Sequence, residues 1–288
     1  SATQDQAPTQ LGFDTWFGFL HQNELRGPSK DGIQFGAPTY INPWLRDNDS
    51  PPVQYTGHLD NILADRAVEF VKQRAGTPAI PWFLNLWFFA PHKPIQPGPN
   101  FQAKYPADAV GAYHALIDQL DFNIGRVLRA LDASGQRDNT LVLVVSDNGG
   151  TNEQLDNNYP FFGKKTEFFE GGVRTPLLMR WPGHIKANTV SDDIVSIFDI
   201  YPTIAGAAAA TVSKSAIGRN LLAEPLYDSP RLYWEYASDQ FHSYSVLSAD
   251  GRWRLPAIFS KLQRSMTYRL IPRVQQMSLT LIHRLPPN

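Results

Sequence analysis

Two short, almost continuously apolar runs constrain the fold more than any other feature. Residues 82–89 read Trp-Phe-Leu-Asn-Leu-Trp-Phe-Phe, and residues 140–145 read Thr-Leu-Val-Leu-Val-Val. Runs of this length predict β-strands covered on both faces, because a half-exposed strand would alternate apolar with polar side chains. Residues 175–181 predict a third strand. The chain therefore needs a sheet whose two faces are both covered.

Helical segments separate these predicted strands. Residues 59–74 and 108–133 place apolar side chains three and four positions apart, and residues 192–209 predict a further helix facing the sheet. Gly76 and Gly135 are placed to end the first two helices. Strands and helices that alternate, with crossovers long enough for parallel pairing, predict an α/β fold with a mostly parallel sheet sandwiched by helices.

The two ends of the chain depart from this pattern. Residues 12–58 are rich in Gly, Pro, Asn and aromatic residues and predict a long ordered loop region. Short alternating segments between residues 232 and 255 predict an antiparallel sheet. We therefore expect an α/β core over residues 1–210 and a small C-terminal antiparallel α+β unit over residues 211–288.

Composition excludes several classes of function. With 288 residues, of which 42% are hydrophobic, the chain can bury a sizeable core. Its net charge of −1 gives no sign of nucleic acid or an anionic membrane as partner. It has no apolar run of about 18 residues, so no membrane span is predicted. It has no cysteine, which excludes disulfides, thiolate metal sites and a cysteine nucleophile within these residues.

Oxygen ligands follow the second apolar run. Asp147 and Asn148 come directly after the predicted strand and before two glycines. Ligands bind beyond the carboxyl ends of strands in open α/β sheets, and carboxylate and amide oxygens suit a hard cation such as Ca²⁺ or Mg²⁺. The same four residues also form ordinary turns. Two oxygen ligands cannot hold a metal alone, so other ligands are required.

His92 follows the first apolar run and lies between Pro91 and Lys93-Pro94. Prolines restrict the backbone around it, which would hold the imidazole in place. A histidine there can donate to an anionic oxygen or act as a general acid. The alternative is a surface histidine without a chemical role.

Lys164 and Lys165 lie in a segment rich in glycine and aromatic residues, from Phe161 to Pro176. A lysine ammonium is a compact charge that can neutralise a tetrahedral anion. The neighbouring pair Gly171-Gly172 permits a tight turn or a close approach of two backbones. A solvated basic loop is the alternative interpretation.

Seven segments, taken in order, resemble the sulfatase family of the alkaline-phosphatase-like superfamily over roughly residues 11–206. One matches the family's Ala-Pro-His-x-Pro signature, and another matches the strand that leads to its metal site. The segments are Gly12–Gly18, Tyr55–Phe70, Ala90–Pro94, Asp121–Leu128, Asp138–Gly150, Glu170–Gly183 and Asp199–Thr203. The resemblance implies a metal-dependent sulfuric ester hydrolase.

The resemblance also implies a role for each candidate residue. Asp147 and Asn148 resemble two ligands of the family's divalent cation, usually calcium. His92 resembles the histidine that contacts the substrate sulfate near the leaving oxygen. The family's sulfate-binding lysine lies five residues before the glutamate of Glu-Gly-Gly, which is Lys165 here. Lys164 stands where many members have glycine.

The sequence lacks the family's nucleophile motif. Members carry Cys/Ser-x-Pro-x-Arg, matured to formylglycine, upstream of Gly-Phe-Asp, together with two more metal aspartates and a Gly-Lys-x-His segment. The segment Arg26-Gly-Pro-Ser-Lys30 resembles this motif only superficially. It follows Gly12-Phe13-Asp14 instead of preceding it, and it has arginine at the nucleophile position. Residues 257–288 contain no acidic residue, unlike the family's ending. We expect a sulfatase truncated at its N-terminus, with an incomplete C-terminal unit.

In the mechanism that the resemblance implies, a formylglycine hydrate attacks sulfur, a cation polarises the sulfate, lysines neutralise its oxygens and a histidine protonates the leaving alcohol. This chain supplies only part of that machinery, so we expect very weak or no turnover from it alone. The alternatives are a phosphonate or phosphate monoester hydrolase on the same scaffold, a non-catalytic anion-binding or glycan-binding protein, and a fragment without an independent role.

The expected substrate is a small sulfated molecule, with sulfated carbohydrate first and aryl sulfate second. Trp44, Tyr159 and Trp234 could stack on sugar rings, although aromatic residues more often pack in cores. Many family members are exported, so the resemblance implies a periplasmic, extracellular or lysosomal location. The sequence itself indicates neither location nor oligomeric state.

Overall fold

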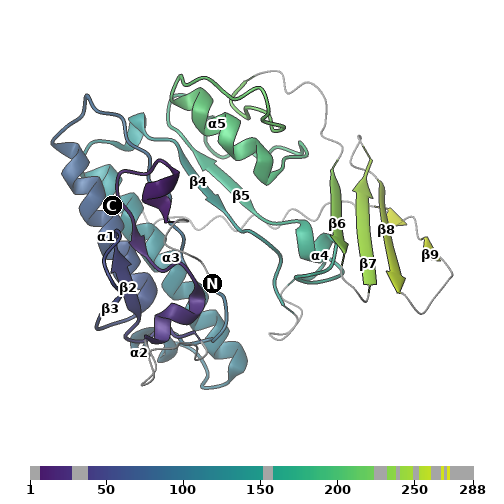
Figure 1. Cartoon of the computed structure of the whole chain (residues 1–288), viewed down its shortest axis with the longest axis horizontal. Coiled ribbons are helices and arrows are strands. Elements are labelled where there is room, and N and C mark those ends of the chain that lie inside the picture. Colours follow the sequence, from purple (N-terminus) through teal and green to yellow (C-terminus); the bar gives the residue numbers. More distant parts are fainter. Residues whose placement is uncertain are drawn as a thin grey trace. The chain divides into compact units, whose positions relative to one another are not determined.

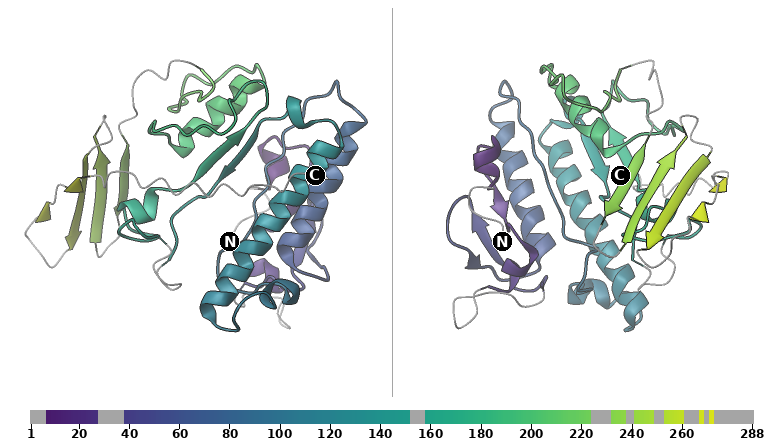
Figure 2. Two further views of the ribbon diagram at one scale, coloured as in Figure 1. Left: turned by 180° about the vertical axis from the view of Figure 1, so that it is seen from behind. Right: turned by 45° about the vertical axis from the view of Figure 1, so that its right-hand side comes forward.

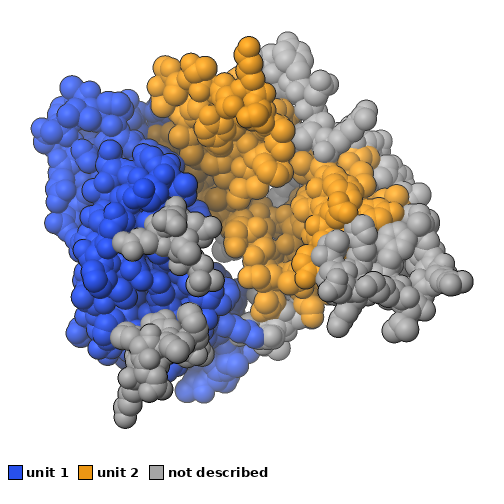
Figure 3. Space-filling model, viewed as in Figure 1, with its two compact units in different colours: residues 1–140, 153–155, 181–184 blue, residues 141–152, 156–180, 185–288 orange. Residues whose placement is uncertain are grey.

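The structure is a computed structural model, and it describes residues 7–27, 38–151, 158–223, 232–237, 241–248, 253–260, 267–268 and 271–272. The chain divides into two compact units, coloured separately in Figure 3. Unit 1 comprises residues 1–140, 153–155 and 181–184, and unit 2 comprises residues 141–152, 156–180 and 185–288. The domain boundary expected after residue 210 stays a prediction.

Unit 1 contains two long α-helices and a small sheet in which β1, β2 and β3 pair antiparallel. Figure 2 shows α1 and α3 side by side, with the sheet beside α1. The elements, labelled in Figure 1, are η2 (Pro8–Leu11), β1 (Phe17–Gly18), η3 (Gln22–Arg26), β2 (Trp44–Asp47), β3 (Val53–Gln54), α1 (Leu59–Ala75), α2 (Pro99–Gln102), α3 (Ala109–Ala133) and η4 (Arg137–Asn139).

Helices α1 and α3 confirm the two helices predicted from periodicity, to within one residue at each end. His58 and Asp108 are their N-caps, and each side chain accepts a backbone N–H of the first turn. The helices bury Leu59, Leu63 and Leu116 in one core cluster, which also holds residues from the preceding segments. The other buried members of that cluster are Leu25, Tyr40, Leu45 and Ala90.

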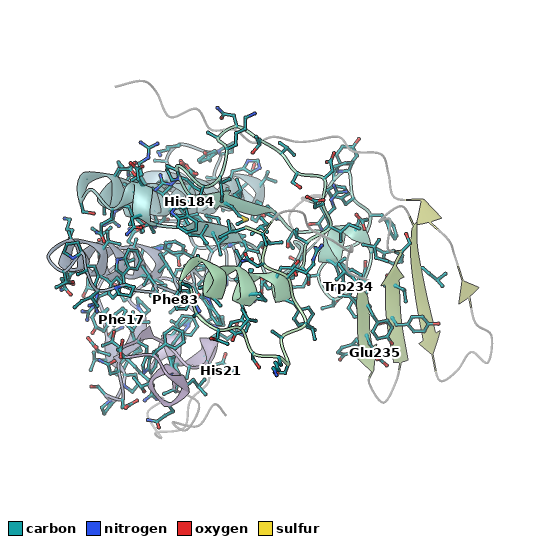
Figure 4. All side chains as sticks on the ribbon, turned by 90° about the horizontal axis from the view of Figure 1, so that it is seen from above. Phe17, His21, Phe83, His184, Trp234 and Glu235 are labelled. Atoms are coloured by element: carbon teal, nitrogen blue, oxygen red, sulfur yellow. The ribbon has the colours of Figure 1, made fainter. Side chains whose placement is uncertain are left out.

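Unit 2 contains the strand pair β4–β5, two short helices and an antiparallel sheet. In that sheet β7 pairs with both β6 and β8, and β9 and β10 both pair with β8. Adjacent residues Trp234 and Glu235 of β6 are labelled in Figure 4. The elements are β4 (Val142–Val145), α4 (Glu170–Val173), β5 (Leu177–Arg180), η6 (Ile197–Asp199), α5 (Ile200–Ala207), β6 (Tyr233–Ala237), β7 (Phe241–Leu247), β8 (Trp253–Ser260), β9 (Thr267–Tyr268) and β10 (Ile271–Pro272).

The expected pairing of the central strands was wrong. β4 and β5 fall on two of the predicted runs, but they pair antiparallel, with Val142 opposite Arg180 and Val145 opposite Leu177. The segment between them returns at the end where β4 stops, and Ser146 N–H there donates to Pro176 O at 3.4 Å. Every strand pair that the structure describes is antiparallel, so the mostly parallel sheet is not found among these strands.

Residues 82–89 do not form a strand, contrary to expectation. Side chains at even positions are half-buried, while Phe83 and Trp87 are 51% and 78% exposed, so only one face of this extended segment is covered. A strand also needs a neighbour that takes up its backbone hydrogen bonds, and no described residue pairs with this segment. Phe83 is labelled in Figure 4.

Three further expectations changed. The loop region expected over residues 12–58 contains the short strands β1, β2 and β3. The helix expected over residues 192–209 is limited to η6 and α5. Val145 and Leu178 are 41% and 56% exposed, so β4 and β5 are not covered on both faces as predicted.

Two other features of the sequence lie outside the described residues. They are the acid-free tail beyond residue 272 and residues 28–30 of the segment Arg26–Lys30, which only superficially resembles the nucleophile motif. None of the helices described is long and apolar enough to cross a membrane.

Candidate functional site

The turn after β4 presents two side-chain oxygen groups. The Ser146 hydroxyl donates to Asn148 O at 3.0 Å, and Asn148 Nδ2 donates to Gly149 O at 3.0 Å. Asp147 is exposed. Within the described part of the chain, no hydrogen bond is formed to the Asp147 carboxylate or to Asn148 Oδ1. Both oxygens therefore remain able to bind a cation.

Glycines let this turn approach the Glu170–Arg174 segment very closely. Gly149 N–H donates to Gly172 O at 2.9 Å. A Cβ on Gly149 would lie 1.8 Å from Gly171 O, and a Cβ on Gly172 would lie 2.0 Å from Glu167 O. Side-chain atoms cannot fit at such distances. The close backbone approach predicted for Gly171-Gly172 is confirmed.

Lys165 is tied to the same turn through its backbone. Lys165 N–H donates to Gly150 O at 2.9 Å. The Asn158 side chain joins Gly150 to the segment just before Lys165, because it accepts from Gly150 N–H and donates to Gly150 O and Gly163 O at 2.9–3.0 Å. Thr166 has a φ of +76°, which is unusual for a β-branched residue. The structure thus brings Asp147, Asn148 and Lys165 into one hydrogen-bonded loop cluster of unit 2.

Gly149→Ala is expected to destabilise unit 2 by roughly 1–3 kcal/mol or more, because its new methyl group would displace the Gly171 backbone. Gly76→Ala is the control, since its Cβ would meet only Gln73 O at 3.5 Å and its φ of −74° suits alanine. Urea unfolding followed by circular dichroism measures both variants. Equal midpoints for Gly149→Ala and wild type would contradict the close approach.

His92 lies in unit 1, on an exposed turn that contains the cis peptide bonds Ala90-Pro91 and Lys93-Pro94. Its Nδ1 is 2.7 Å from Lys93 O. A carbonyl oxygen can only accept, so Nδ1 carries the proton and Nε2 is the nitrogen left for another partner. The predicted grouping of His92 with the three residues of unit 2 stays a prediction.

Three buried residues behind this turn were not assigned a role from the sequence. The Asp60 carboxylate accepts from Phe89 N–H at 3.0 Å and from Ala90 N–H at 3.2 Å. Tyr40 Oη donates to His92 O at 2.8 Å. His58 Nδ1 accepts from Asp60 N–H at 3.3 Å, so Nε2 carries the proton and donates to Gln96 O at 3.0 Å.

Burial shifts the ionisation of all three groups. It raises the pKa of Asp60 to about 6, against the lowering effect of the hydrogen bonds from Phe89 and Ala90. It lowers the pKa of His58 to about 4, against the raising effect of the hydrogen bond to Gln96. Burial, and then the charge of Asp60, raises the pKa of Tyr40 well above its ordinary value. His58 and Tyr40 are therefore neutral near pH 7.

Asp60 and His58 are expected to change stability with pH in opposite directions. The contribution of Asp60 to the free energy of unfolding is fully present below its ordinary pKa of 3.8 and is lost as pH rises through about 6. The contribution of His58 is fully present above 6.5 and is lost as pH falls through about 4. Relative to wild type, Asp60→Asn should therefore gain stability as pH rises from about 4 to about 6. His58→Asn should gain stability relative to wild type as pH falls from about 6.5 to about 4.

Urea unfolding of both variants and wild type across this pH range measures the two differences, which should each reach on the order of 1–3 kcal/mol. Because every other titrating group is shared, it cancels in the comparison with wild type. A difference that is independent of pH for either variant would contradict the buried environment of that residue.

The donor types of Asp147 and Asn148 fit a hard cation, because both offer free side-chain oxygens. Their number is small, since Ca²⁺ takes six to eight oxygen ligands. No group of three or more His, Cys, Asp or Glu side chains that could hold a metal is found among the residues with a described placement. Any complete cation site therefore requires ligands beyond this pair.

Solved structures resemble the fold of this chain. A crystal structure of Ps i-CgsB in complex with k-i-k-neocarrahexaose has a TM-score of 0.79 and 27% identity, and it covers 94% of this chain and 62% of that chain. The putative sulfatase yidJ from Bacteroides fragilis has a TM-score of 0.67 and 18% identity, with coverage of 81% and 57%. These neighbours define an α/β fold of the alkaline-phosphatase-like class.

The Sulfatase family model matches residues 2–210, and the chain belongs to the sulfatase family. Among curated relatives, a sulfatase from Formosa agariphila is 36% identical over 185 residues, 59% of this chain. Human N-acetylgalactosamine-6-sulfatase is 34% identical over 243 residues, 79% of this chain. The chain spans 32% and 45% of the length of these two relatives.

Proposed function

We propose that this chain is part of a sulfatase that hydrolyses sulfate monoesters of carbohydrates. The observation that carries the proposal is the backbone bond from Lys165 N–H to Gly150 O, at 2.9 Å. It ties the lysine to the turn that carries Asp147 and Asn148, so a cation and an ammonium group can act on one anion. Membership of the sulfatase family supports the sulfate ester as that anion.

In this proposal Asp147 and Asn148 hold a divalent cation, most suitably Ca²⁺, together with ligands from elsewhere. The cation would supply Lewis-acid polarisation of the sulfate oxygens when bound. Asp147 contributes a full negative charge, and Asn148 contributes a neutral carbonyl oxygen. Glycines at positions 149 and 150 keep bulky side chains away from the bound anion.

Lys165 would neutralise the charge on the sulfate oxygens. Its side chain is half-buried, which strengthens its attraction for an anion relative to a fully solvated lysine. Its backbone is fixed by Gly150 O. Lys164 lies beside it, and its backbone N–H donates to the Glu167 carboxylate at 3.2 Å. Lys165 is the candidate for contact with the sulfate, because it lies five residues before the glutamate of Glu170-Gly171-Gly172, where the family's sulfate-binding lysine stands.

His92 would protonate the leaving oxygen. Its Nδ1–H is held by Lys93 O, so in the imidazolium form the Nε2–H is free to donate. After the proton has moved, the ring keeps the Nδ1–H tautomer that the same carbonyl favours. His92 thus combines an exposed ring with a defined direction for proton transfer.

Sulfated carbohydrate is the proposed substrate class, with aryl sulfate as second candidate. The solved neighbour is in complex with k-i-k-neocarrahexaose, and the human relative is named for N-acetylgalactosamine 6-sulfate. Tyr159 is 81% exposed and lies close in sequence to Lys165, where its ring could stack on a sugar.

Lys165→Ala is expected to weaken binding of N-acetylgalactosamine 6-sulfate by about ten- to hundredfold in the presence of calcium, because it removes a charged partner of the anion. Lys186→Ala, at an exposed lysine of the same unit, is the matched control and should leave affinity unchanged. Isothermal titration calorimetry measures both. If the chain bound N-acetylgalactosamine 6-phosphate more tightly than the 6-sulfate, a phosphate monoester hydrolase would be favoured. If it bound unsulfated N-acetylgalactosamine as tightly as the 6-sulfate, a glycan-binding protein would be favoured.

Sulfate release from nitrophenyl sulfate by the purified chain is expected to be very weak or absent. The chain has no cysteine, and its sequence contains no Cys/Ser-x-Pro-x-Arg motif. We therefore place the nucleophile outside this sequence. Ion chromatography of released sulfate measures the rate, with the Lys165→Ala variant as control. A rate of sulfate release well above that of the Lys165→Ala variant would show that these 288 residues contain a nucleophile.

A further inference from the structure

A buried carboxylate holds the start of the turn that carries His92. Asp60 is fully buried in the first turn of α1, yet its two oxygens accept from the N–H groups of the adjacent residues Phe89 and Ala90, at 3.0 and 3.2 Å. We propose that Asp60 and Tyr40 are positioning residues for His92, fixing the backbone on both sides of its imidazole. The catalytic value of this role rests on the proposed function, since it assumes that His92 acts on the ester.

Tyr40 holds the other side of the same turn. Its ring is fully buried, and its Oη donates to His92 O at 2.8 Å. The ring packs on His58, with centroids 5.1 Å apart, and on Phe89, with centroids 5.0 Å apart. A hydroxyl so enclosed has few orientations, so it fixes the carbonyl of His92 itself.

Gln96 closes the arrangement beyond the turn. Its side-chain oxygen accepts from Tyr40 N–H at 3.0 Å, and its backbone oxygen accepts from His58 Nε2 at 3.0 Å. The segment from Phe89 to Gln96 is therefore bonded to residues 40, 58 and 60 at four of its positions: 89, 90, 92 and 96. A turn that is hydrogen-bonded at these four positions keeps one backbone conformation.

Fixing the backbone determines where the ring of His92 can lie. The imidazole is exposed, but it packs on Phe89 with centroids 4.8 Å apart and donates through Nδ1 to Lys93 O. Both contacts depend on the backbone from 89 to 93 keeping its path. A ring held by two contacts loses rotamer freedom before substrate arrives, which lowers the entropic cost of the reactive arrangement.

The chemistry of Asp60 suits this role better than that of an uncharged residue. A carboxylate has two accepting oxygens, and both are used by adjacent N–H groups. An asparagine could serve only one of them, because its other group is a donor and would oppose the second N–H. Asp60→Asn is therefore expected to restore part of what Asp60→Ala removes.

NMR of the full chain with nitrogen-labelled histidine tests the proposal. In wild type, the neutral His92 ring should show the Nδ1–H tautomer, with the signal assigned through His92→Gln. Asp60→Ala and Tyr40→Phe should shift His92 toward mixed tautomers, with Asp60→Asn in between. The control is Glu69→Gln, on the same helix but exposed. His114, exposed on α3 of the same unit, reports on whether the fold is kept. A His92 signal that stays at its wild-type position in Tyr40→Phe and Asp60→Asn would overturn the proposal.

Ester binding separates positioning from a general structural effect. Asp60→Asn should weaken binding of the sulfated sugar about three- to tenfold in wild type and have no effect in a His92→Gln background. Equal losses in both backgrounds would overturn the positioning role. If the chain bound no ester at all, the proposed function would fail, while the NMR signals of His92 would still decide whether Asp60 and Tyr40 hold the ring.

Discussion

Backbone hydrogen bonding outside regular secondary structure is the constraint on which both candidate loops depend. Buried N–H and C=O groups must find partners, and neither the His92 turn nor the turn after β4 lies in a strand ladder. Unit 1 supplies these partners from side chains, chiefly the Asp60 carboxylate and the Tyr40 hydroxyl. Unit 2 supplies them from the backbone, through glycines that allow two segments to touch, and from the Asn158 side chain.

The two solutions have different chemical consequences. Side-chain partners leave the His92 ring free to face solvent while its backbone is fixed from behind. Backbone-to-backbone contact leaves the Asp147 carboxylate and Asn148 Oδ1 without a hydrogen bond among the described residues, so these oxygens are available to a cation. Under the proposed function, each loop keeps its proposed reactive atoms, the oxygens of Asp147 and Asn148 and the Nε2 of His92, without a partner among the described residues, while other atoms fix the backbone.

Sequence reasoning succeeded where the determining contacts are local. Helices α1 and α3 follow from the apolar spacing within each segment, and the structure adds the N-caps His58 and Asp108 directly before them. It failed for the pairing of β4 with β5, because pairing depends on the path of the intervening chain. The run at 82–89 has the composition of a strand, but composition cannot supply the neighbour that a strand requires.

The residues of the candidate site also divide into those that the sequence could identify and those that it could not. Asp147, Asn148, His92 and Lys165 could be selected because they follow apolar runs or match family signatures at fixed spacing. Asp60 lies in the matching segment Tyr55–Phe70 but could not be assigned a role, because an aspartate in the first turn of a helix is ordinarily a solvated residue. Its burial depends on Phe89 and Ala90, about thirty residues away, and no local pattern encodes that contact.

The hydrogen bonds that the Asp60 carboxylate accepts also affect local opening of this part of the molecule. Local opening normally starts at helix ends and at loops, each on its own. Here the first turn of α1 and the 89–90 backbone share one carboxylate, so neither can detach without breaking bonds of the other. Fraying of the helix start and release of the turn are therefore coupled, because each opening acts on the same two hydrogen bonds.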